Sequence, residues 1–276
     1  MGEKKIGWFK GCAIGCGLLL LVLILGCVAF GYFTVSPFHK AVDKREKIEE
    51  QFGPRDAFVP QADGRIPADR IEAFIGVRES LMELCREFEE SFGQFERMEQ
   101  LGDEEELEGG TLTKELFKTM GSAFGMAPLM GRFFDTRNEA LLEQGMGLGE
   151  YAYLYTVIYG KELNAFEDLE GAHIDSNPLE GRIRDDILTI LGNQRAAIEA
   201  LPEEERDVAF LEALTEELDR LEENYGRFPW QDGPPPPLEE SLALYRERLR
   251  ELYCMETAGL ELHRSESNGL NVQSIE

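Results

Sequence analysis

The predicted fold class depends on the secondary structure of the stretch Gly147–Lys161, GLGEYAYLYTVIYGK. Its pattern fits both a strand and a helix. Locally it alternates like a strand, with tyrosines at the odd positions Tyr151, Tyr153, Tyr155 and Tyr159. A strand needs a partner for its backbone groups, and no second convincing strand pattern follows the N-terminal segment. On a helix, Tyr151, Tyr155 and Tyr159 share one face. We therefore predict a helix that is apolar nearly all round and lies at the centre of a bundle.

The chain beyond residue 35 has the apolar spacing of amphipathic helices. In the longest periodic stretch, which follows Pro67, the inward positions are Ile71, Phe74, Arg78, Leu81, Cys85, Phe88, Phe92 and Phe95. Further helices are expected over residues 36–52, 112–124, 128–145, 178–201, 203–225 and 238–257. The prediction is an all-α fold, an irregular bundle of about six to eight helices. It forms one acidic domain over residues 36–258, and residues 259–276 form a disordered tail.

The N-terminal segment 11–33, GCAIGCGLLLLVLILGCVAFGYF, contains no charged residue. About 20 apolar residues span a bilayer as a helix, because every backbone group is then bonded within the segment. Residues 1–33 carry a net charge of +2, whereas the remainder has 25 basic and 53 acidic residues. The positive-inside bias predicts a single-pass membrane protein with residues 1–10 in the cytoplasm and the acidic domain outside it.

Two alternatives for the N-terminal segment stay open. It could be a signal peptide that is cleaved. Residues 23–27, LILGC, resemble the lipobox at which bacterial lipoproteins are cut and lipidated, which would put a lipid on Cys27. The residues that follow, VAFGYFTV, stay apolar, whereas a mature lipoprotein usually begins with a small polar tether. We therefore favour an uncleaved membrane helix.

Charge and cysteine content limit the partners. A chain with a net charge of −26 repels nucleic-acid phosphates, so nucleic acid is excluded as a partner. The expected membrane partner is the lipid bilayer, which the chain contacts through the apolar residues 11–33. Gly11 and Gly15 form a GxxxG motif, which permits a homodimer. Cys85 and Cys254 lie beyond the membrane segment, where an oxidising exterior permits a disulfide between them without requiring one.

Arg78 interrupts the inward stripe of the longest helix with a charge. A core-facing arginine must reach water along its own stem or find a carboxylate. Glu150, in the first turn of the tyrosine helix, is the partner that we expect. Buried tyrosines also need partners for their hydroxyls. The candidate ligand-binding residues are therefore Glu150, Tyr151, Tyr155, Tyr159 and Arg78, with core packing as the alternative role of the tyrosines.

Motifs for catalysis or metal binding are lacking. The histidines, His39, His173 and His263, are scattered, and no HExxH, GxSxG or P-loop pattern occurs, so no metal or cofactor is expected. Arg132 and Arg137 are expected to form ion pairs within the acidic chain. A catalytic carboxylate pair is spatial rather than sequential, so the sequence neither reveals nor excludes one.

The sequence thus favours a non-catalytic function, in which a membrane-anchored extracytoplasmic domain binds a protein partner or acts as a scaffold. The first alternative is a small-molecule-binding helical domain with a tyrosine-lined cavity. Such a cavity would need a volume of about 300 Å³ or more. A carboxylate-dependent hydrolase ranks last.

Overall fold

The computed structural model describes residues 36–104, 111–170, 178–224 and 227–262. Regular structure in these residues is helical throughout and includes no strand, which confirms the predicted all-α class. The elements are a helix over residues 36–52, η1 (Arg55–Ala57), α2 (Ala68–Glu104), α3 (Thr111–Glu143), α4 (Leu148–Glu170), α5 (Pro178–Glu199), η2 (Glu203–Glu205), α6 (Val208–Glu223), α7 (Pro236–Leu242), α8 (Arg246–Glu251) and α9 (Ala258–Glu261).

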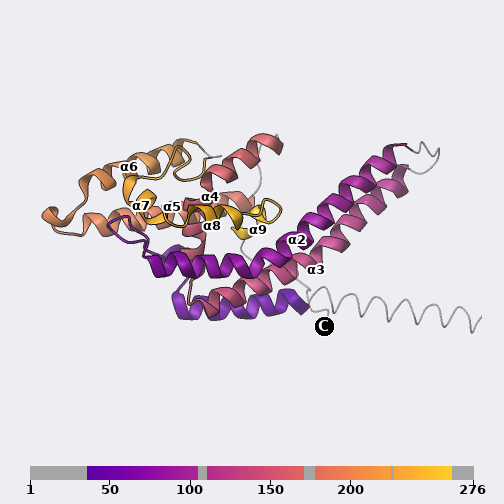
Figure 1. Cartoon of the computed structure of the whole chain (residues 1–276), viewed down its shortest axis with the longest axis horizontal. Helices are drawn as coiled ribbons and strands as arrows, with labels where there is room; N and C mark the ends of the chain where they lie inside the picture. Colours follow the sequence, from indigo (N-terminus) through magenta and orange to yellow (C-terminus); the bar gives the residue numbers. More distant parts are fainter. Residues whose placement is uncertain (1–35, 105–110, 171–177, 225–226, 263–276) are drawn as a thin grey trace, which may run out of the picture.

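The two longest helices, α2 and α3, pack on each other in antiparallel orientation (Figure 1). One end of the pair belongs to the body of the molecule and the other end projects from it. We call the projecting part the arm; it consists of the C-terminal half of α2 and the N-terminal half of α3, residues 86–104 and 111–127. The helix over residues 36–52 packs on the body end of α3, where the Asn138 side chain donates to the Ala41 carbonyl at 2.8 Å. The short helices α7 to α9 lie across the body (Figure 1).

The tyrosine stretch forms α4, as predicted, and α4 lies at the centre of the body. It contacts α5, η1 and α9. Tyr151, Tyr155 and Tyr159 are at most 2% exposed. The ring of Phe74 on α2 lies 5.4 Å from the ring of Tyr151. The part of α4 from Leu148 to Gly160 is therefore enclosed by its neighbours, which is why this part of the sequence carries no polar stripe.

Two predicted boundaries were wrong. The helices expected over 112–124 and 128–145 form the single helix α3, with Pro128 inside it. Proline removes one helical hydrogen bond, but the packing of α3 along α2 offsets this cost. In contrast, the single helix expected over 238–257 is broken into α7, α8 and the extended turns before α9.

The tail predicted from residue 259 begins too early, because α9 spans Ala258–Glu261 and both Glu261 and Leu262 are buried. The predicted membrane segment, residues 11–33, lies outside the described residues, as do the alternative lipidation site Cys27 and residues 263–276. Within the described ranges, no helix has the length and apolar character needed to cross a bilayer.

Gly149, in the first turn of α4, is required by close packing against η1. A Cβ atom there would lie 2.1 Å from the carbonyl oxygen of Arg55 and 2.6 Å from the Cβ atom of Phe58. One of these atoms is a backbone atom and the other is bonded directly to the backbone, so neither can move independently. A side chain at position 149 would therefore push η1 away from α4. Gly149, the residue before Glu150, is therefore explained by packing.

We expect Gly149→Ala to destabilise the fold by about 1–3 kcal/mol, the usual cost of overpacking. Gly192→Ala, inside α5, is the matched control, because a Cβ atom there meets nothing within 4 Å. That variant should gain about 0.5–1 kcal/mol from the higher helix propensity of alanine. Urea denaturation of both variants measures the difference, and an equal effect of the two substitutions would refute the packing role of Gly149.

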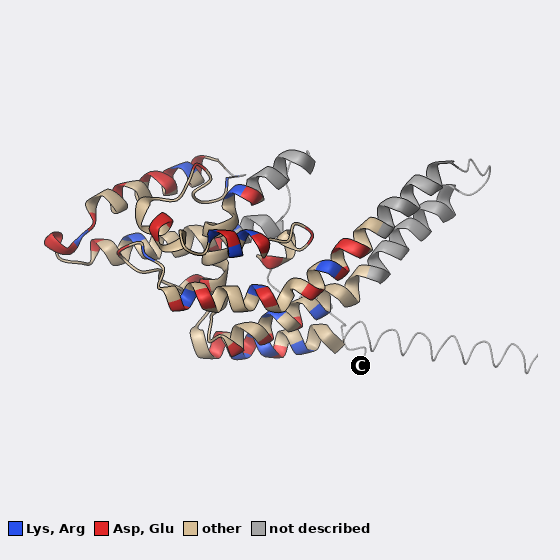
Figure 2. Ribbon diagram, viewed as in Figure 1, with Lys and Arg blue, Asp and Glu red and all other residues tan. Residues whose placement is uncertain are grey.

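Acidic residues are spread over the described helices rather than gathered on one face (Figure 2). Many of them pair with arginines at the surface. For example, Arg248 on α8 contacts Glu72 at 2.9 Å and Glu79 at 2.8 Å, so the C-terminal part of the chain is fastened to α2. Exposed pairs of this kind contribute little to stability.

Candidate functional site

Arg78 lies at the centre of a buried polar cluster and is 0% exposed. Its guanidinium forms an ion pair with the Glu261 carboxylate, which is also fully buried. The Tyr151 hydroxyl donates to the other carboxylate oxygen of Glu261 at 2.6 Å. Arg78 Nη2 also donates to the Leu252 carbonyl at 2.8 Å. A buried charge is tolerated when it is paired and hydrogen-bonded in this way.

The tyrosine face of α4 packs on this cluster. The guanidinium carbon of Arg78 lies 5.3 Å from the ring centre of Tyr155 and 5.9 Å from that of Tyr159, within the range of cation–π contacts. The Tyr159 hydroxyl donates to the Leu249 carbonyl at 2.7 Å. The Tyr155 hydroxyl has no hydrogen-bond partner among the described residues. Two of the three tyrosine hydroxyls therefore bind the C-terminal part of the chain.

The segment that covers the tyrosine face is the C-terminal strap, which we define as residues 252–262. Two more buried arginines hold its backbone. Arg137 on α3 donates to the carbonyls of Leu260 at 3.2 Å and Glu261 at 2.8 Å. Arg55 in η1 donates to the Leu262 carbonyl at 2.6 Å. Arginines from three separate elements thus converge on three consecutive residues of the strap.

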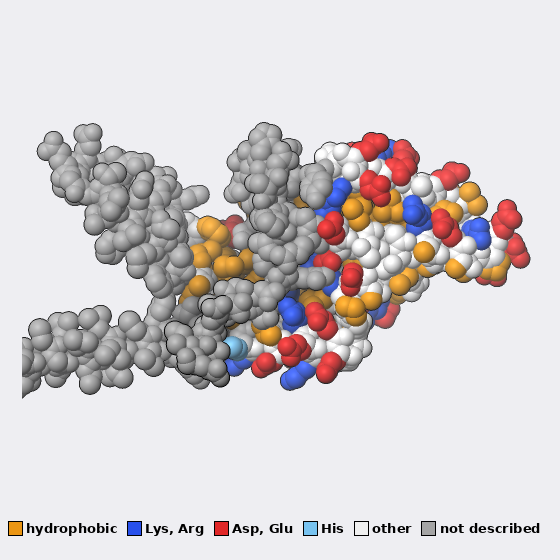
Figure 3. Space-filling model, turned by 180° about the vertical axis from the view of Figure 1, so that it is seen from behind, with side chains coloured by type: hydrophobic (Ala, Val, Ile, Leu, Met, Phe, Trp, Pro, Cys, Tyr) orange, Lys and Arg blue, Asp and Glu red, His pale blue; other side chains and the backbone are white. Residues whose placement is uncertain are grey.

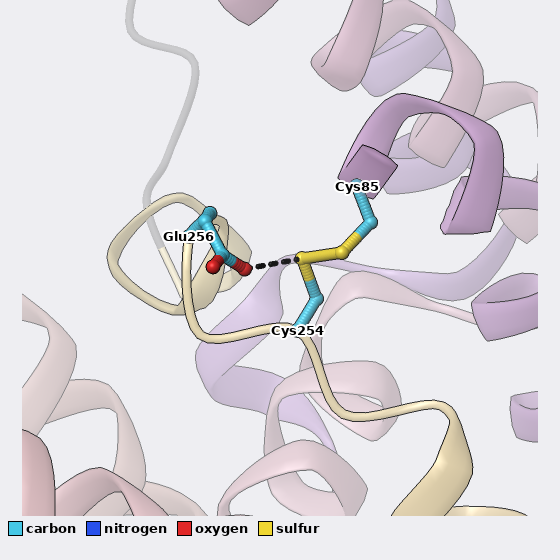
Figure 4. Close-up of side chains that lie close together, drawn as sticks. All are labelled: Cys85, Cys254 and Glu256. Carbon is cyan, nitrogen blue, oxygen red and sulfur yellow. Dashed lines mark hydrogen bonds between the residues drawn. A yellow bond between two sulfur atoms is a disulfide. The ribbon is translucent and has the colours of Figure 1, made fainter. Parts of the chain in front are cut away.

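The strap is also joined covalently to α2. A disulfide connects Cys85, on the same helix as Arg78, to Cys254, and their Cα atoms lie 6.1 Å apart (Figure 4). The Glu256 carboxylate lies 3.5 Å from the Cys254 sulfur. In the described part of the chain, these are the only three side chains of metal-binding type that lie close enough together to share a metal ion. Both sulfurs are used by the disulfide, so they offer no thiolate to a metal.

The expected pair of Arg78 with Glu150 was wrong. Glu150 instead receives two hydrogen bonds of 2.6 Å from Arg70. Arg70 lies near the start of α2, close to the first turn of α4, whereas Arg78 reaches the middle of α4. Glu150 therefore lies apart from the polar cluster that contains the tyrosines, and the candidate ligand-binding set falls into two groups.

Glu261 and Arg55 are the cluster members that the sequence did not single out. Glu261 was assigned to the tail, although leucines flank it on both sides, and these are both packed against the core. Of the two arginines expected to form ion pairs, Arg132 does so with Glu87, at 2.5 and 2.8 Å. The hydrogen bonds described for Arg137 go to backbone carbonyls.

Burial shifts the ionisation of this cluster. Desolvation raises the pKa of Tyr151 and raises the pKa of Tyr155 well above 10, because a tyrosinate would lose its hydration. Desolvation also lowers the pKa of Arg137 to about 10. The positive charge of Arg78 opposes the shift of both tyrosines. At neutral pH these tyrosines are therefore neutral, and the Tyr151 hydroxyl is the one that donates to the strap, at Glu261.

These shifts predict a loss of stability at alkaline pH. A tyrosine whose pKa is raised by folding contributes stability that is fully present below its unfolded pKa of about 10 and is lost as pH rises above that value. Burial also raises the pKa of Tyr153, Tyr159 and Tyr253, so five described tyrosines act in this direction, whereas the lowered pKa of Arg137 acts in the opposite one. As the pH is raised, the absorbance of tyrosinate should therefore increase in one cooperative step that coincides with unfolding. Gradual ionisation of all eight tyrosines in the folded chain near pH 10 would contradict this expectation.

Comparison with family models, with curated proteins and with solved structures found no match to this chain. The site therefore has to be interpreted from its own geometry. Its charged groups are buried and directed at a segment of the same chain. This arrangement fixes the strap to the body by its carboxylate and its backbone carbonyls.

Proposed function

We propose that this chain is a membrane-anchored extracytoplasmic helical domain that acts as a non-catalytic protein-interaction module. The observation that carries the proposal is the contrast between the two ends of α2. At the body end, the polar cluster around Arg78 is filled by the chain's own strap. At the other end, α2 and α3 continue into the arm, where two helices have mainly each other as neighbours (Figure 1).

The anchor and its orientation are supported by the N-terminal sequence and by the disulfide. Residues 11–33 are apolar and follow three lysines, which favours a single membrane pass with the N-terminus inside. The Cys85–Cys254 disulfide fits an oxidising compartment, because thiols are kept reduced in most cytosols. A lipoprotein anchored at Cys27 would present the same domain to the same compartment.

The arm is the part that we assign to partner binding. Hydrophobic side chains gather where the arm leaves the body (Figure 3). Phe92, within the arm, is 44% exposed, and Met126 and Met130 of α3 are half-buried. Exposed aromatic and methionine side chains are enriched in protein interfaces. With a net charge of −26, the chain favours a partner with a basic rim around an apolar centre.

Binding of a small molecule to the tyrosine face is less well supported. A ligand there would need free hydroxyl groups, but those of Tyr151 and Tyr159 already bind Glu261 and the Leu249 carbonyl. We therefore place partner binding on the arm and core packing on the tyrosines.

Photo-crosslinking in intact cells tests the proposal. Phe92 is replaced by the photoreactive residue p-benzoylphenylalanine, and the same replacement at Leu244 is the control, because Leu244 is 93% exposed but lies on the body between α7 and α8. We expect a discrete adduct with an extracytoplasmic or membrane protein, or with a second copy of the chain, from position 92 and not from 244. Equal adducts from both positions, no adduct, or adducts with cytoplasmic proteins would contradict the proposal.

A further inference from the structure

The helix over residues 36–52 starts beside α3, where the arm leaves the body. Gly131 of α3 packs so closely on this start that a Cβ atom there would lie 3.0 Å from Pro37 and 3.0 Å from Phe38. Two segments that are far apart in sequence therefore form one surface. We call residues 36–42 and 126–134 together the proximal surface.

The proximal surface contains no acidic residue, in a chain in which 54 of 276 residues are acidic. Its charged residues are Lys40 and Arg132, and both are exposed. On α3 the run without acids covers residues 116–134, the longest such run after residue 35. Both segments of the proximal surface accordingly show blue but no red in Figure 2. This surface therefore lacks the negative charge that makes the rest of the chain repel phosphate groups.

Acidic residues at the border of the proximal surface on α2 and α3 are paired with basic ones. Glu87 on α2 forms an ion pair with Arg132. Asp135 on α3 lies 2.7 Å from the Lys44 amine. Asp43, on the first helix, is exposed and marks the edge of the surface there. The negative charge next to residues 126–134 is thus compensated within the domain.

The apolar side chains of the proximal surface are partly open to solvent. Those that are half-buried are Phe38, Met126, Ala127, Pro128 and Met130. Hydrophobic side chains gather in this region, where the arm leaves the body (Figure 3). Apolar side chains with basic ones beside them are typical of protein surfaces that lie at a bilayer–water interface.

We propose that the proximal surface lies on the extracytoplasmic leaflet of the bilayer, with its apolar side chains among the phospholipid headgroups and Lys40 against their phosphate groups. This inference rests on the membrane anchor of the proposed function and adds the bilayer as a second contact of the domain. Phe92, the position proposed for the protein partner, lies on α2 and outside the proximal surface.

The short link to the anchor supports this placement. With residues 11–33 across the bilayer, three residue steps lead from residue 33 to Ser36, and they span at most about 11 Å. The headgroup layer extends about 5–8 Å beyond the hydrocarbon core. Ser36 therefore lies in this layer or just above it. Because Gly131 packs on Pro37 and Phe38, the adjoining turns of α3 are brought to the same level.

Photo-crosslinking of the full chain in lipid vesicles tests the placement. The vesicles contain equal amounts of phosphatidylcholine and phosphatidylglycerol and no other protein. Met130 is replaced by p-benzoylphenylalanine, and Arg132 is a second position because its exposed side chain can be replaced without disturbing the core. Val208, which is 56% exposed, is the control, since the turn between α5 and α6 lies at the opposite end of the body from the arm (Figure 1). Flotation measures anchoring, circular dichroism checks the fold, and mass spectrometry measures the adducts.

We expect phospholipid adducts from positions 130 and 132 and none above background from position 208. Equal adducts from all three positions, or adducts of 130 and 132 only with a second copy of the chain, would overturn the proposal. A folded chain that floats with the vesicles but gives no lipid adduct would overturn this inference and leave the anchor standing. A chain that does not float would overturn both.

Charge reversal at Lys40 tests the contact with phosphate groups. Lys40→Glu should lower the yield of lipid adducts from position 130 by about fivefold, the usual effect of one basic residue near an anionic membrane surface. Lys47→Glu is the matched control, because Lys47 is exposed on the same helix but lies outside the proximal surface. This control should leave the yield unchanged. Equal reductions by the two substitutions would assign the effect to the net charge of the chain and overturn the contact of Lys40.

Discussion

Replacing Arg78 by Met is expected to lower the free energy of unfolding by about 3–5 kcal/mol, the range found when one partner of a buried ion pair is removed. The substitution leaves the Glu261 carboxylate buried with the Tyr151 hydroxyl and the more distant Thr257 hydroxyl as its remaining donors. It also leaves the Leu252 carbonyl without the donor that Arg78 provides. Glu261→Leu should have an effect of similar size, because it strands the Arg78 guanidinium instead. Urea denaturation monitored by circular dichroism measures both.

The double variant Arg78→Met/Glu261→Leu distinguishes a stranded charge from simple loss of packing. With both charges removed, most of the loss should be recovered, since an apolar pair of similar volume can replace a buried ion pair. If the double variant is as unstable as the sum of the two single variants, the two side chains are not coupled and the pair is not the centre of the site. Arg248→Met is the matched control at the surface, and it should leave stability unchanged within error.

Removing the disulfide has the second large effect. Cys85 and Cys254 are 169 residues apart in sequence, and closing so long a loop restricts the unfolded chain. The chain-entropy model gives about 5 kcal/mol for a loop of this length. We expect the Cys85→Ser/Cys254→Ser variant to be destabilised by about 3–5 kcal/mol, because hydrogen bonds of the strap still hold part of the same contacts.

Serine substitution is preferable to reduction alone for this measurement. The chain has three more cysteines, Cys12, Cys16 and Cys27, which a reductant would also reach. Reduction of the double serine variant should therefore cause no further loss of stability. A further loss on reduction would show that the N-terminal cysteines contribute to the effect of the reductant. An unfolding midpoint of the double serine variant equal to that of the wild type would show that the disulfide does not restrain the strap.

The helical fold could be predicted from the sequence because apolar spacing is a local property and because a helix, unlike a strand, satisfies its backbone groups within itself. The tyrosine stretch illustrates this point. Its alternating pattern favours a strand, but the absence of a partner strand decided for the helix that α4 forms. Pro128 illustrates the opposite case, because tertiary packing with α2 outweighs the local cost of a proline inside a helix.

The polar cluster could be predicted only in part. A charge in the stripe of α2 marked Arg78 as a core-facing residue that either reaches water or finds a carboxylate, and the structure shows the second of these. The choice of Glu150 was wrong because periodicity gives the face of a helix but not which of its turns meets a neighbour. Arg70, two turns before Arg78 on the same face of α2, is the residue that reaches Glu150. Glu261 was missed because a segment of one helical turn carries too short a pattern to be distinguished from a tail.

Hydrogen–deuterium exchange of the oxidised full chain tests most directly whether the strap closes the tyrosine–arginine face. The amides of Leu260 and Glu261 donate to the Thr257 carbonyl at 2.8 and 3.1 Å. If the strap is held as described, these amides should exchange within about tenfold of the rate of the α4 amides, and far more slowly than the exposed turn around Leu244. Exchange of residues 258–262 as fast as in an unstructured peptide would contradict the account.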